Sequence, residues 1–426
     1  MGGLAQNQAM LFGARALQGA FGALLAPASL ALLTVLFTDT RERAKAFAVY
    51  GAIAGGGSAV GLLLGGVLTE YADWRWCFWV NLPVAIVAIA LAIPIVPESK
   101  APGDTSYDVP GAVLITLGLA SVVYGFTRVA QTSQTNATAA AAANARTAAQ
   151  GGTTLLTPDS GWTDGLAWTF IIGGLVLVAL FVVLELRTRN PLLPMRIVLD
   201  RNRGGAYLTS TLVGAGLIGA FFFLSLYFQQ VLGYKPVEAG FASLPTTLGV
   251  LVSAGAASAL VPRIGPKPLM VLGGLLAASG LFLLSFLQVD TSFWTLPFWG
   301  ELLLGLGLGF TFVPLSNLAL VGAGAHDAGA ASAVLQAVQQ VGASIGTALL
   351  ATISVAAITA SFTDALAGGK SPQDPLVAMS AQVDGYTTAF RWASLLLLLG
   401  AVVSAVLVKA TKEDLPTEAD ALVHAG

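Results

Sequence analysis

Arg15 is the residue of this chain whose charge contrasts most strongly with its surroundings. It lies within the apolar stretch 8–37, and a permanent charge near a bilayer centre costs roughly 3 kcal/mol on insertion scales, which marks a functional position. Gln18, Gly19 and Gly22 follow at spacings of three, four and seven residues. A cation, an amide and two bare backbone patches therefore share one helix face, which predicts a polar site inside a membrane helix.

Glu301 is a second candidate for proton chemistry. It lies about two turns into the apolar stretch 295–320, and a carboxyl group inside a membrane helix is a functional-site hypothesis by default. A side chain that reaches back to the membrane surface explains the same position. The sequence leaves both readings open.

Two groups of side chains are candidates for a substrate cavity. Phe223, Tyr227 and Gln230 fall on one helix face, where they offer stacking surface and polar tips to a flat or cationic organic compound; lipid-facing aromatic residues give the same pattern. The second group consists of amides, which must face protein or water because unpaired amides in lipid cost several kcal/mol, so they line a cavity or bond between helices. Its members are Gln336, Gln339, Gln340 and Asn317.

Four glycines in the stretch 46–69 form a small-residue seam. Gly57, Gly61 and Gly65 recur every four residues and Gly66 follows directly. This spacing lets two helices approach backbone to backbone. Tight static packing explains the seam, and so does an interface that slides during alternating access.

These residues lie in a strongly apolar chain. Of its 426 residues 56% are hydrophobic and 10% charged, and the mean hydropathy is +0.79, values that predict an all-α polytopic membrane protein rather than a soluble domain. The net charge of −2 gives no reason to expect nucleic acid as a partner. With one cysteine and two histidines, we expect neither a metal site nor a cofactor.

About eleven segments are long and apolar enough to cross a bilayer. Most of the 20 Lys and Arg residues fall in alternate loops, which predicts a cell-membrane protein with its N-terminus outside and its C-terminus in the cytoplasm. Residues 128–165, rich in Ala, Thr, Gln and Gly, are expected to form a long outer loop. Within it the Ala stretch 139–143 has no face to bury and is expected to be loop or marginal helix. The expected spans are 8–37, 46–69, 77–97, 109–127, 166–185, 204–230, 239–261, 269–288, 295–320, 330–358 and 386–409.

Three stretches together resemble the major facilitator superfamily, specifically its fourteen-span drug:proton antiporters. Leu11-x-x-x-Arg15-x-x-Gln18-Gly19 resembles the family's fourth-helix motif, and the glycine seam resembles its fifth-helix antiporter motif. Trp74-Arg75-Trp76 through Asn81-x-Pro83 is similar to the entry of helix six. The resemblance implies that Arg15, together with Gln18, takes part in proton coupling and that the seam moves. Glu301 joins them as a candidate for proton coupling through its position in an apolar span alone.

The resemblance also implies a domain organisation. Residues 1–97 correspond to family helices four to six, 98–190 to two linker helices with the loop 128–165, 191–410 to a six-helix C-terminal bundle, and 411–426 to a cytoplasmic tail. On this alignment the first three family helices are missing, so the chain is a truncated form or has a misplaced start. Leu62 and Phe21 also depart from the motifs, at a usual proline and a usual small residue.

We therefore expect a monomeric, non-enzymatic transporter that exports amphipathic drugs or small organic compounds in exchange for protons. Proton-coupled uptake and export of a self-made metabolite fit the same fold, and a truncated, non-transporting chain is a further alternative. A membrane-embedded enzyme is less favoured, since the inner loops lack the clustered carboxylates or histidines that such chemistry requires.

Overall fold

The computed structural model describes residues 1–37, 63–96, 108–149, 161–188, 193–320, 328–371 and 374–411, together with isolated positions between them. Throughout this described part the regular structure is helical, which confirms the all-α prediction. Nine helices there are long and apolar enough to span a membrane, and they correspond to the last nine of the eleven expected spans. The expected first span is a helix too, whereas much of the expected span 46–69 lies outside the described residues.

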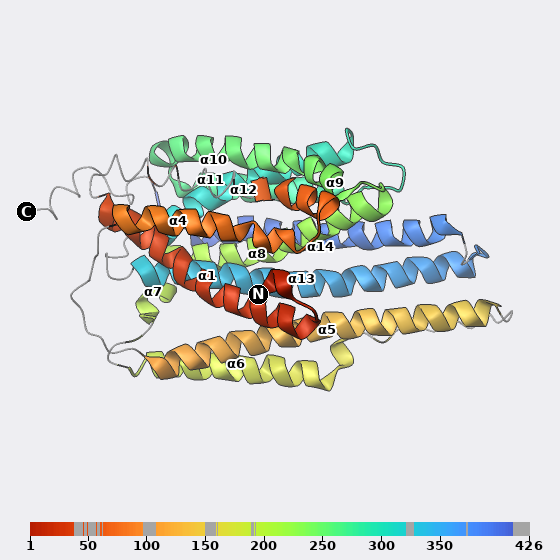
Figure 1. Cartoon of the computed structure of the whole chain (residues 1–426), viewed down its shortest axis with the longest axis horizontal. Coiled ribbons are helices and arrows are strands. Elements are labelled where there is room, and N and C mark those ends of the chain that lie inside the picture. Colours follow the sequence, from red (N-terminus) through yellow and green to blue (C-terminus); the bar gives the residue numbers. More distant parts are fainter. Residues whose placement is uncertain are drawn as a thin grey trace, which may run out of the picture.

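Figure 1 shows the long helices running roughly side by side along one axis. Residues 63–71 are also helical. The elements are η1 (Gly2–Leu4), α1 (Gln8–Leu36), α3 (Trp76–Trp79), α4 (Asn81–Ile95), α5 (Val109–Ala149), η2 (Gly161–Thr163), α6 (Gly165–Glu185), α7 (Met195–Leu199), α8 (Arg201–Leu226), η3 (Tyr227–Val231), α9 (Pro236–Ala242), α10 (Leu244–Ile264), α11 (Pro266–Leu284), α12 (Leu296–Leu320), α13 (Ala328–Ala367) and α14 (Pro375–Leu407).

The helices α8 and α10 to α14 form one bundle with a continuous apolar core. Within it α12 packs on α10 and α11, and α14 packs on α8, α11 and α13. Two glycines of α13 allow its contact with α8: a Cβ at Gly342 would collide with the Thr211 carbonyl, and one at Gly346 with the backbone of Ala215. The largest buried side chains at the centre of the bundle include Tyr227, Phe228 and Phe390.

The helix α5 departs from the expected organisation. It continues from the bilayer-length segment through Ala149, so residues 128–149 of the expected outer loop 128–165 are helical. The prediction of a loop is wrong there, and the Ala stretch 139–143 has the helical one of its two expected structures. Alanine has the highest helix propensity, so the backbone can be helical without a broad apolar face. The hydroxyls of Thr135 and Thr138 donate to carbonyls four residues earlier within this helix. One side of α5 packs on α6 and another on α13 (Figure 1).

The N-terminal helices lie on the outside of this assembly. The helix α1 contacts α13, and in Figure 1 α1 and α4 pass over the bundle from one end towards its middle. No described residue of α4 is buried in the chain, although its sequence is strongly apolar. These helices therefore have few protein contacts of their own compared with the C-terminal bundle.

Candidate functional site

A cavity of about 650 Å3 lies between α5, α8, α13 and α14. Its walls mix apolar side chains with amides and hydroxyls, and among the residues that the structure describes the lining contains no Asp, Glu, Lys, Arg or His. The volume falls in the range typical of sites for drug-sized ligands, roughly 300–1,000 Å3. The lining residues are Thr127, Ala130, Gln131, Gln134, Ile218, Phe222, Phe223, Leu226, Gln230, Gln340, Ala343, Ser344, Thr347, Ala348, Ala351, Ser354, Val355, Ile358 and Tyr386.

An aromatic pair and an amide define one wall of the cavity. The rings of Phe223 and Tyr386 lie 5.8 Å apart at an interplanar angle of 38°, and the Tyr386 hydroxyl donates to Gln230 Oε1 over 2.9 Å. This hydrogen bond links the end of α8 to α14 across the cavity. The wall can stack a planar group and also hydrogen-bond to it.

The opposite wall comes from α5. Thr127, Gln131 and Gln134 line the cavity at spacings of four and three residues, which places them on one face of the helix. The side chains of Gln131 and Gln134 are exposed to the cavity and solvent rather than packed in the core. The sequence contained this pattern, but it falls in the stretch expected to be a loop, and no helix face was assigned there.

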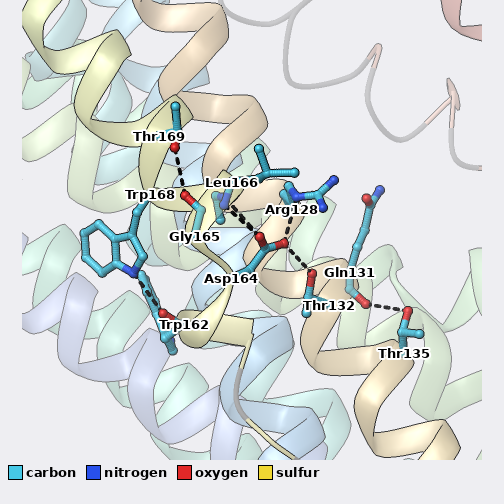
Figure 2. Close-up of polar contacts among 11 residues, drawn as sticks. Arg128, Gln131, Thr132, Thr135, Trp162, Asp164, Gly165, Leu166, Trp168 and Thr169 are labelled. Carbon is cyan, nitrogen blue, oxygen red and sulfur yellow. Dashed lines mark hydrogen bonds and ion pairs between the residues drawn. The ribbon is translucent and has the colours of Figure 1, made fainter.

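An ion pair fixes α5 against α6 beside this wall. Arg128 Nε lies 2.7 Å from Asp164 Oδ2, and the Thr132 hydroxyl donates to the same oxygen over 3.1 Å. The other carboxylate oxygen caps α6 by accepting from the backbone of Leu166 and Ala167. Figure 2 shows these donors converging on Asp164 from α5 and from the start of α6. Arg128 and Thr132 directly follow Thr127 and Gln131 in the sequence. Their contacts with Asp164 therefore fix the position of α5 along its axis and its rotation about that axis, and so place the cavity-lining face of α5.

The charge of Asp164 is favoured by these contacts. Desolvation acts to raise the pKa of Asp164, but the hydrogen bonds from Leu166, Thr132 and Ala167 and the charge of Arg128 lower it by more. The net effect holds the pKa of Asp164 below its usual value. The carboxylate is therefore ionised at neutral pH and serves as an anchor rather than as a proton carrier.

The predicted cavity residues are distributed over two regions. Phe223, Gln230 and Gln340 line the cavity, whereas Tyr227 is buried and donates from its hydroxyl to the Gln288 carbonyl over 2.8 Å. The last turn of α8 passes into a π-helical segment, so Tyr227 and Gln230 do not share a face as a regular helix would place them. Gln336, Gln339 and Asn317 lie on α13 and α12 but not in the cavity lining.

The predicted arginine site lies at the exposed face of α1. The Arg15 guanidinium donates to Gln18 Oε1 over 3.0 Å and sits 4.6 Å from the centre of the Phe78 ring. Both Arg15 and Gln18 are exposed within the chain. The expected cation and amide are thus paired, and an aromatic face supports the cation.

The glycine seam makes one close contact within the described residues. A Cβ at Gly66 would lie 2.8 Å from the Pro236 carbonyl oxygen, whereas one at Gly57, Gly61 or Gly65 would meet open space. Next to this contact Glu70 Oε2 accepts from the backbone N–H of Val237 over 3.2 Å. Glu70 Oε1 lies 3.9 Å from Lys235 Nζ. The end of this helix therefore docks on the N-terminus of α9.

Glu301 lies apart from all of these groups. It is 0% exposed between α12 and α10, so the side chain does not reach back to the membrane surface. Neither carboxylate oxygen has a hydrogen-bond partner among the described residues. The same part of the chain holds no group of three or more His, Cys, Asp or Glu side chains arranged for a metal ion.

Residues 1–347 match the profile described as Major Facilitator Superfamily, which covers most of the helices that build the cavity. The chain belongs to the Major Facilitator Superfamily. It is a multi-pass membrane transporter of that superfamily, in agreement with its nine described apolar helices.

Three relatives show which members of the superfamily it is similar to. It is 40% identical to the puromycin resistance protein pur8 of Streptomyces alboniger, over 97% of this chain and 76% of that protein. It is 33% identical to the cephamycin export protein CmcT of Amycolatopsis lactamdurans, over 83% and 68% of the two chains. It is 29% identical to the tetracenomycin C resistance and export protein of Streptomyces glaucescens, over 87% and 64%. The prediction of the family of drug exporters is confirmed.

Sequence reasoning missed several residues that line the cavity of this transporter. In the sequence Tyr386 is only the first residue of the expected span 386–409, and Ser344 and Thr347 are small polar residues beside Gly342 and Gly346. Tyr386 precedes Phe390 by four residues, and this spacing is that of an ordinary core face. Only the contact with Gln230 identifies Tyr386 as a cavity residue.

Proposed function

We propose that this transporter exports amphipathic organic compounds in exchange for protons by alternating access, and that the cavity between α5, α8, α13 and α14 holds the exported compound. The observation that carries the proposal is a drug-sized cavity whose aromatic pair and amides come from four helices. The names of the relatives, which describe resistance to puromycin and export of cephamycin and tetracenomycin C, support the same substrate class.

The lining defines what the cavity accepts. With no ionised side chain in the wall, affinity comes from apolar burial, from stacking on Phe223 and Tyr386, and from hydrogen bonds to Gln131, Gln134 and Gln340. A cation is tolerated through the faces of the aromatic rings but is not paired with a carboxylate. We therefore propose planar, hydrogen-bonding compounds that are neutral or weakly basic as substrates.

The remaining predicted residues have roles in coupling and movement. Arg15 with Gln18, and Glu301, take part in proton coupling, and Gly57, Gly61, Gly65 and Gly66 lie on the helix that moves. Tyr227, Gln336, Gln339 and Asn317 support the cavity from neighbouring faces. The contact of Gly66 and Glu70 with α9 supports a moving interface at that position, because the contact is small and polar.

The proposed setting follows from the loop charges and from the chemistry of the site. The transporter acts as a monomer in the cell membrane, with the N-terminus of this chain outside and its C-terminus in the cytoplasm. It works without a cofactor, a metal ion, a nucleic acid or an enzymatic step. Uptake by the same fold is the alternative, and the relatives named as export proteins favour export.

Transport of puromycin by the purified chain in proteoliposomes tests this proposal. We expect a pH gradient to drive puromycin across the bilayer, and we expect Gln340→Leu to weaken its apparent affinity by about three- to tenfold, because one hydrogen bond contributes about 0.5–1.5 kcal/mol. Gln288→Leu is the matched control, since Gln288 is exposed outside the cavity lining. Equal effects of the two variants, or puromycin flux that ignores the gradient, would contradict the proposal.

A further inference from the structure

The most unusual polar group in the molecule is Glu301. Its side chain is fully buried, and neither of its carboxylate oxygens has a hydrogen-bond partner among the described residues. A buried ionised carboxylate without partners is costly, and proteins retain such a group where it has a function. The cavity does not use it, because Glu301 is absent from the lining.

Thr246 is the residue that faces this carboxyl group. The backbone of Thr246 packs against Gly305, one helical turn after Glu301 on α12. The hydroxyl and the backbone N–H of Thr246 both interact with Glu301, without a hydrogen bond of regular geometry. The Thr246 hydroxyl is likewise buried without a partner among the described residues. Two unpartnered polar groups therefore face each other between α10 and α12.

Helix geometry determines which ligand fits this site. Thr246 lies in the first turn of the 21-residue helix α10, which follows α9 after the single residue Ser243, and the dipole at the start of a helix favours an anion. The same end repels a metal cation next to the carboxylate. A proton is different, because it removes the charge and leaves an acid whose O–H can be donated to the Thr246 hydroxyl. The start of α10 thus stabilises the ionised form of Glu301, and burial stabilises its protonated form.

No other charge of the described residues competes for Glu301. The helices packed on α12 are α8, α10, α11 and α13. Arg201 and Arg203 start α8, Arg263 is in the last turn of α10 and Lys267 in the first turn of α11, all at the opposite ends of those helices. Asp364 lies in the last turn of α13, and none of these side chains acts on Glu301 electrostatically.

The interface that holds the site is packed closely through backbone. Around it a Cβ at Gly249 would lie 2.8 Å from the Leu302 carbonyl, and one at Gly305 would collide with the Thr246 carbonyl. A small shift of α10 along α12 would therefore change the separation of Thr246 and Glu301. The preceding helix α9 receives Glu70 on its N-terminus, which joins the site to the N-terminal helices.

From this arrangement we infer that Glu301 and Thr246 form the proton-binding site of the C-terminal bundle. The inference rests on the proposed proton-coupled export. The bound proton converts the Glu301 carboxylate to a carboxylic acid, and on release it returns to water. Glu301 is five residues, or about 8 Å, from the start of α12, so the route is short and opens on the side of the α11–α12 connection.

Infrared difference spectroscopy of the purified full-length chain, between acidic and neutral pH, tests the inference without any substrate. We expect a carbonyl band of a protonated carboxylic acid that disappears in Glu301→Gln and changes its pH midpoint in Thr246→Val. Asp290→Asn removes an exposed carboxyl from the α11–α12 connection and should leave the band in place. A band that persists unchanged in Glu301→Gln would overturn the inference.

Puromycin transport in proteoliposomes supplies the second readout. In Glu301→Gln we expect accumulation driven by a pH gradient to fall at least about tenfold, while exchange of puromycin at equal pH stays within about twofold of wild type. Full gradient-driven accumulation in this variant would also overturn the inference. If wild type moves no puromycin, the proposed function fails for that compound, yet the infrared band still decides whether Glu301 binds the proton. Glu301→Asp, which keeps the acid, separates a loss of chemistry from a loss of folding.

Discussion

At the scale of single residues, the pairing of Arg15 gives the clearest expectation. Its guanidinium is held by Gln18 over 3.0 Å and by the Phe78 ring at 4.6 Å, so its direction is fixed although it is exposed. A guanidinium group with a fixed direction can orient the charge of a partner group, whereas a charge that serves only solubility needs no fixed direction. The exposed position also means that replacing it should not create a cavity in the core.

We predict that Arg15→Ala lowers gradient-driven puromycin accumulation by about tenfold or more, which corresponds to about 1.4 kcal/mol in coupling. Arg15→Lys keeps the charge but not the planar guanidinium group. Its puromycin accumulation should therefore lie between that of wild type and that of Arg15→Ala. The measurement is transport in proteoliposomes at matched protein density. Arg146→Ala, on the exposed last turn of α5, is the control. Full accumulation in Arg15→Ala would exclude a role for Arg15 in coupling.

The hydroxyl of Tyr386 allows a finer test of the cavity. Tyr386→Phe keeps the ring contact with Phe223 and removes only the donor that engages Gln230. We predict that the dissociation constant for puromycin changes by about three- to tenfold, which corresponds to the usual free energy of one hydrogen bond. The midpoint of thermal unfolding should change little. Binding by fluorescence titration measures it. Tyr124→Phe, on the exposed side of α5, should leave the affinity as it is.

At the scale of elements, the spans were predictable, including the first part of α5, but the continuation of α5 from residue 128 to Ala149 was not. The length and apolarity of a segment predict a helix, because in lipid the backbone groups of a single spanning segment can be satisfied only by helical hydrogen bonds. Residues 128–149 carry no such signal: their helix depends on alanine propensity and on burial of single residues such as Val129 and Ala140. The π-helical segment that follows α8 was also not predictable, because the residue types around Tyr227 do not indicate an extra residue in the turn.

The same difference between local sequence signals and tertiary packing explains which cavity residues could be predicted. Phe223, Gln230 and Gln340 stood out as aromatic or amide residues in apolar spans, and they lie in the lining. Their partners Gln131 and Tyr386 depend on how α5 and α14 pack, and packing between helices distant in the sequence has no local pattern. Composition indicates that a polar residue needs a partner, but only the fold determines which one.

The ion pair between α5 and α6 makes a prediction that depends on pH. We expect Asp164→Asn to lower the midpoint of thermal unfolding at neutral pH, because Asn cannot pair with the charge of Arg128. The pKa of Asp164 is lowered in the folded protein, so its charge stabilises the fold fully above the unfolded value of about 3.9. That contribution is lost as the pH falls through the lower, folded pKa.

The difference in melting temperature between wild type and Asp164→Asn should therefore be constant near neutral pH and vanish in strong acid. Thermal unfolding in detergent, followed by circular dichroism at several pH values, measures it. Asp159→Asn removes an exposed carboxylate from the same connection and serves as the control. A difference that grows towards acid would show that the stabilising group is not this carboxylate.

At the scale of the whole molecule, the buried carboxyl lies within the C-terminal bundle and the cavity lies between that bundle and α5. The described N-terminal helices touch the bundle in few places. The helix 63–71 reaches α9 through Gly66 and Glu70. Because α9 continues into α10, which carries Thr246, we propose that movement of one half reaches the proposed proton site of the other half through this contact. Alternating access by this chain then requires the contact to open and close once in each cycle.

We therefore predict that locking this contact stops transport. With Cys77→Ser as the background, Glu70→Cys and Lys235→Cys can be joined by a short bifunctional thiol reagent, since the two native side chains approach within 3.9 Å. We expect cross-linking to reduce puromycin flux at least about tenfold, with recovery when a reducible linker is cleaved. Each single cysteine treated with the same reagent is the control. A cross-linked transporter that still accumulates puromycin would show that the contact is static, and the moving interface would then have to lie elsewhere along α1 and α13, where the two parts also meet.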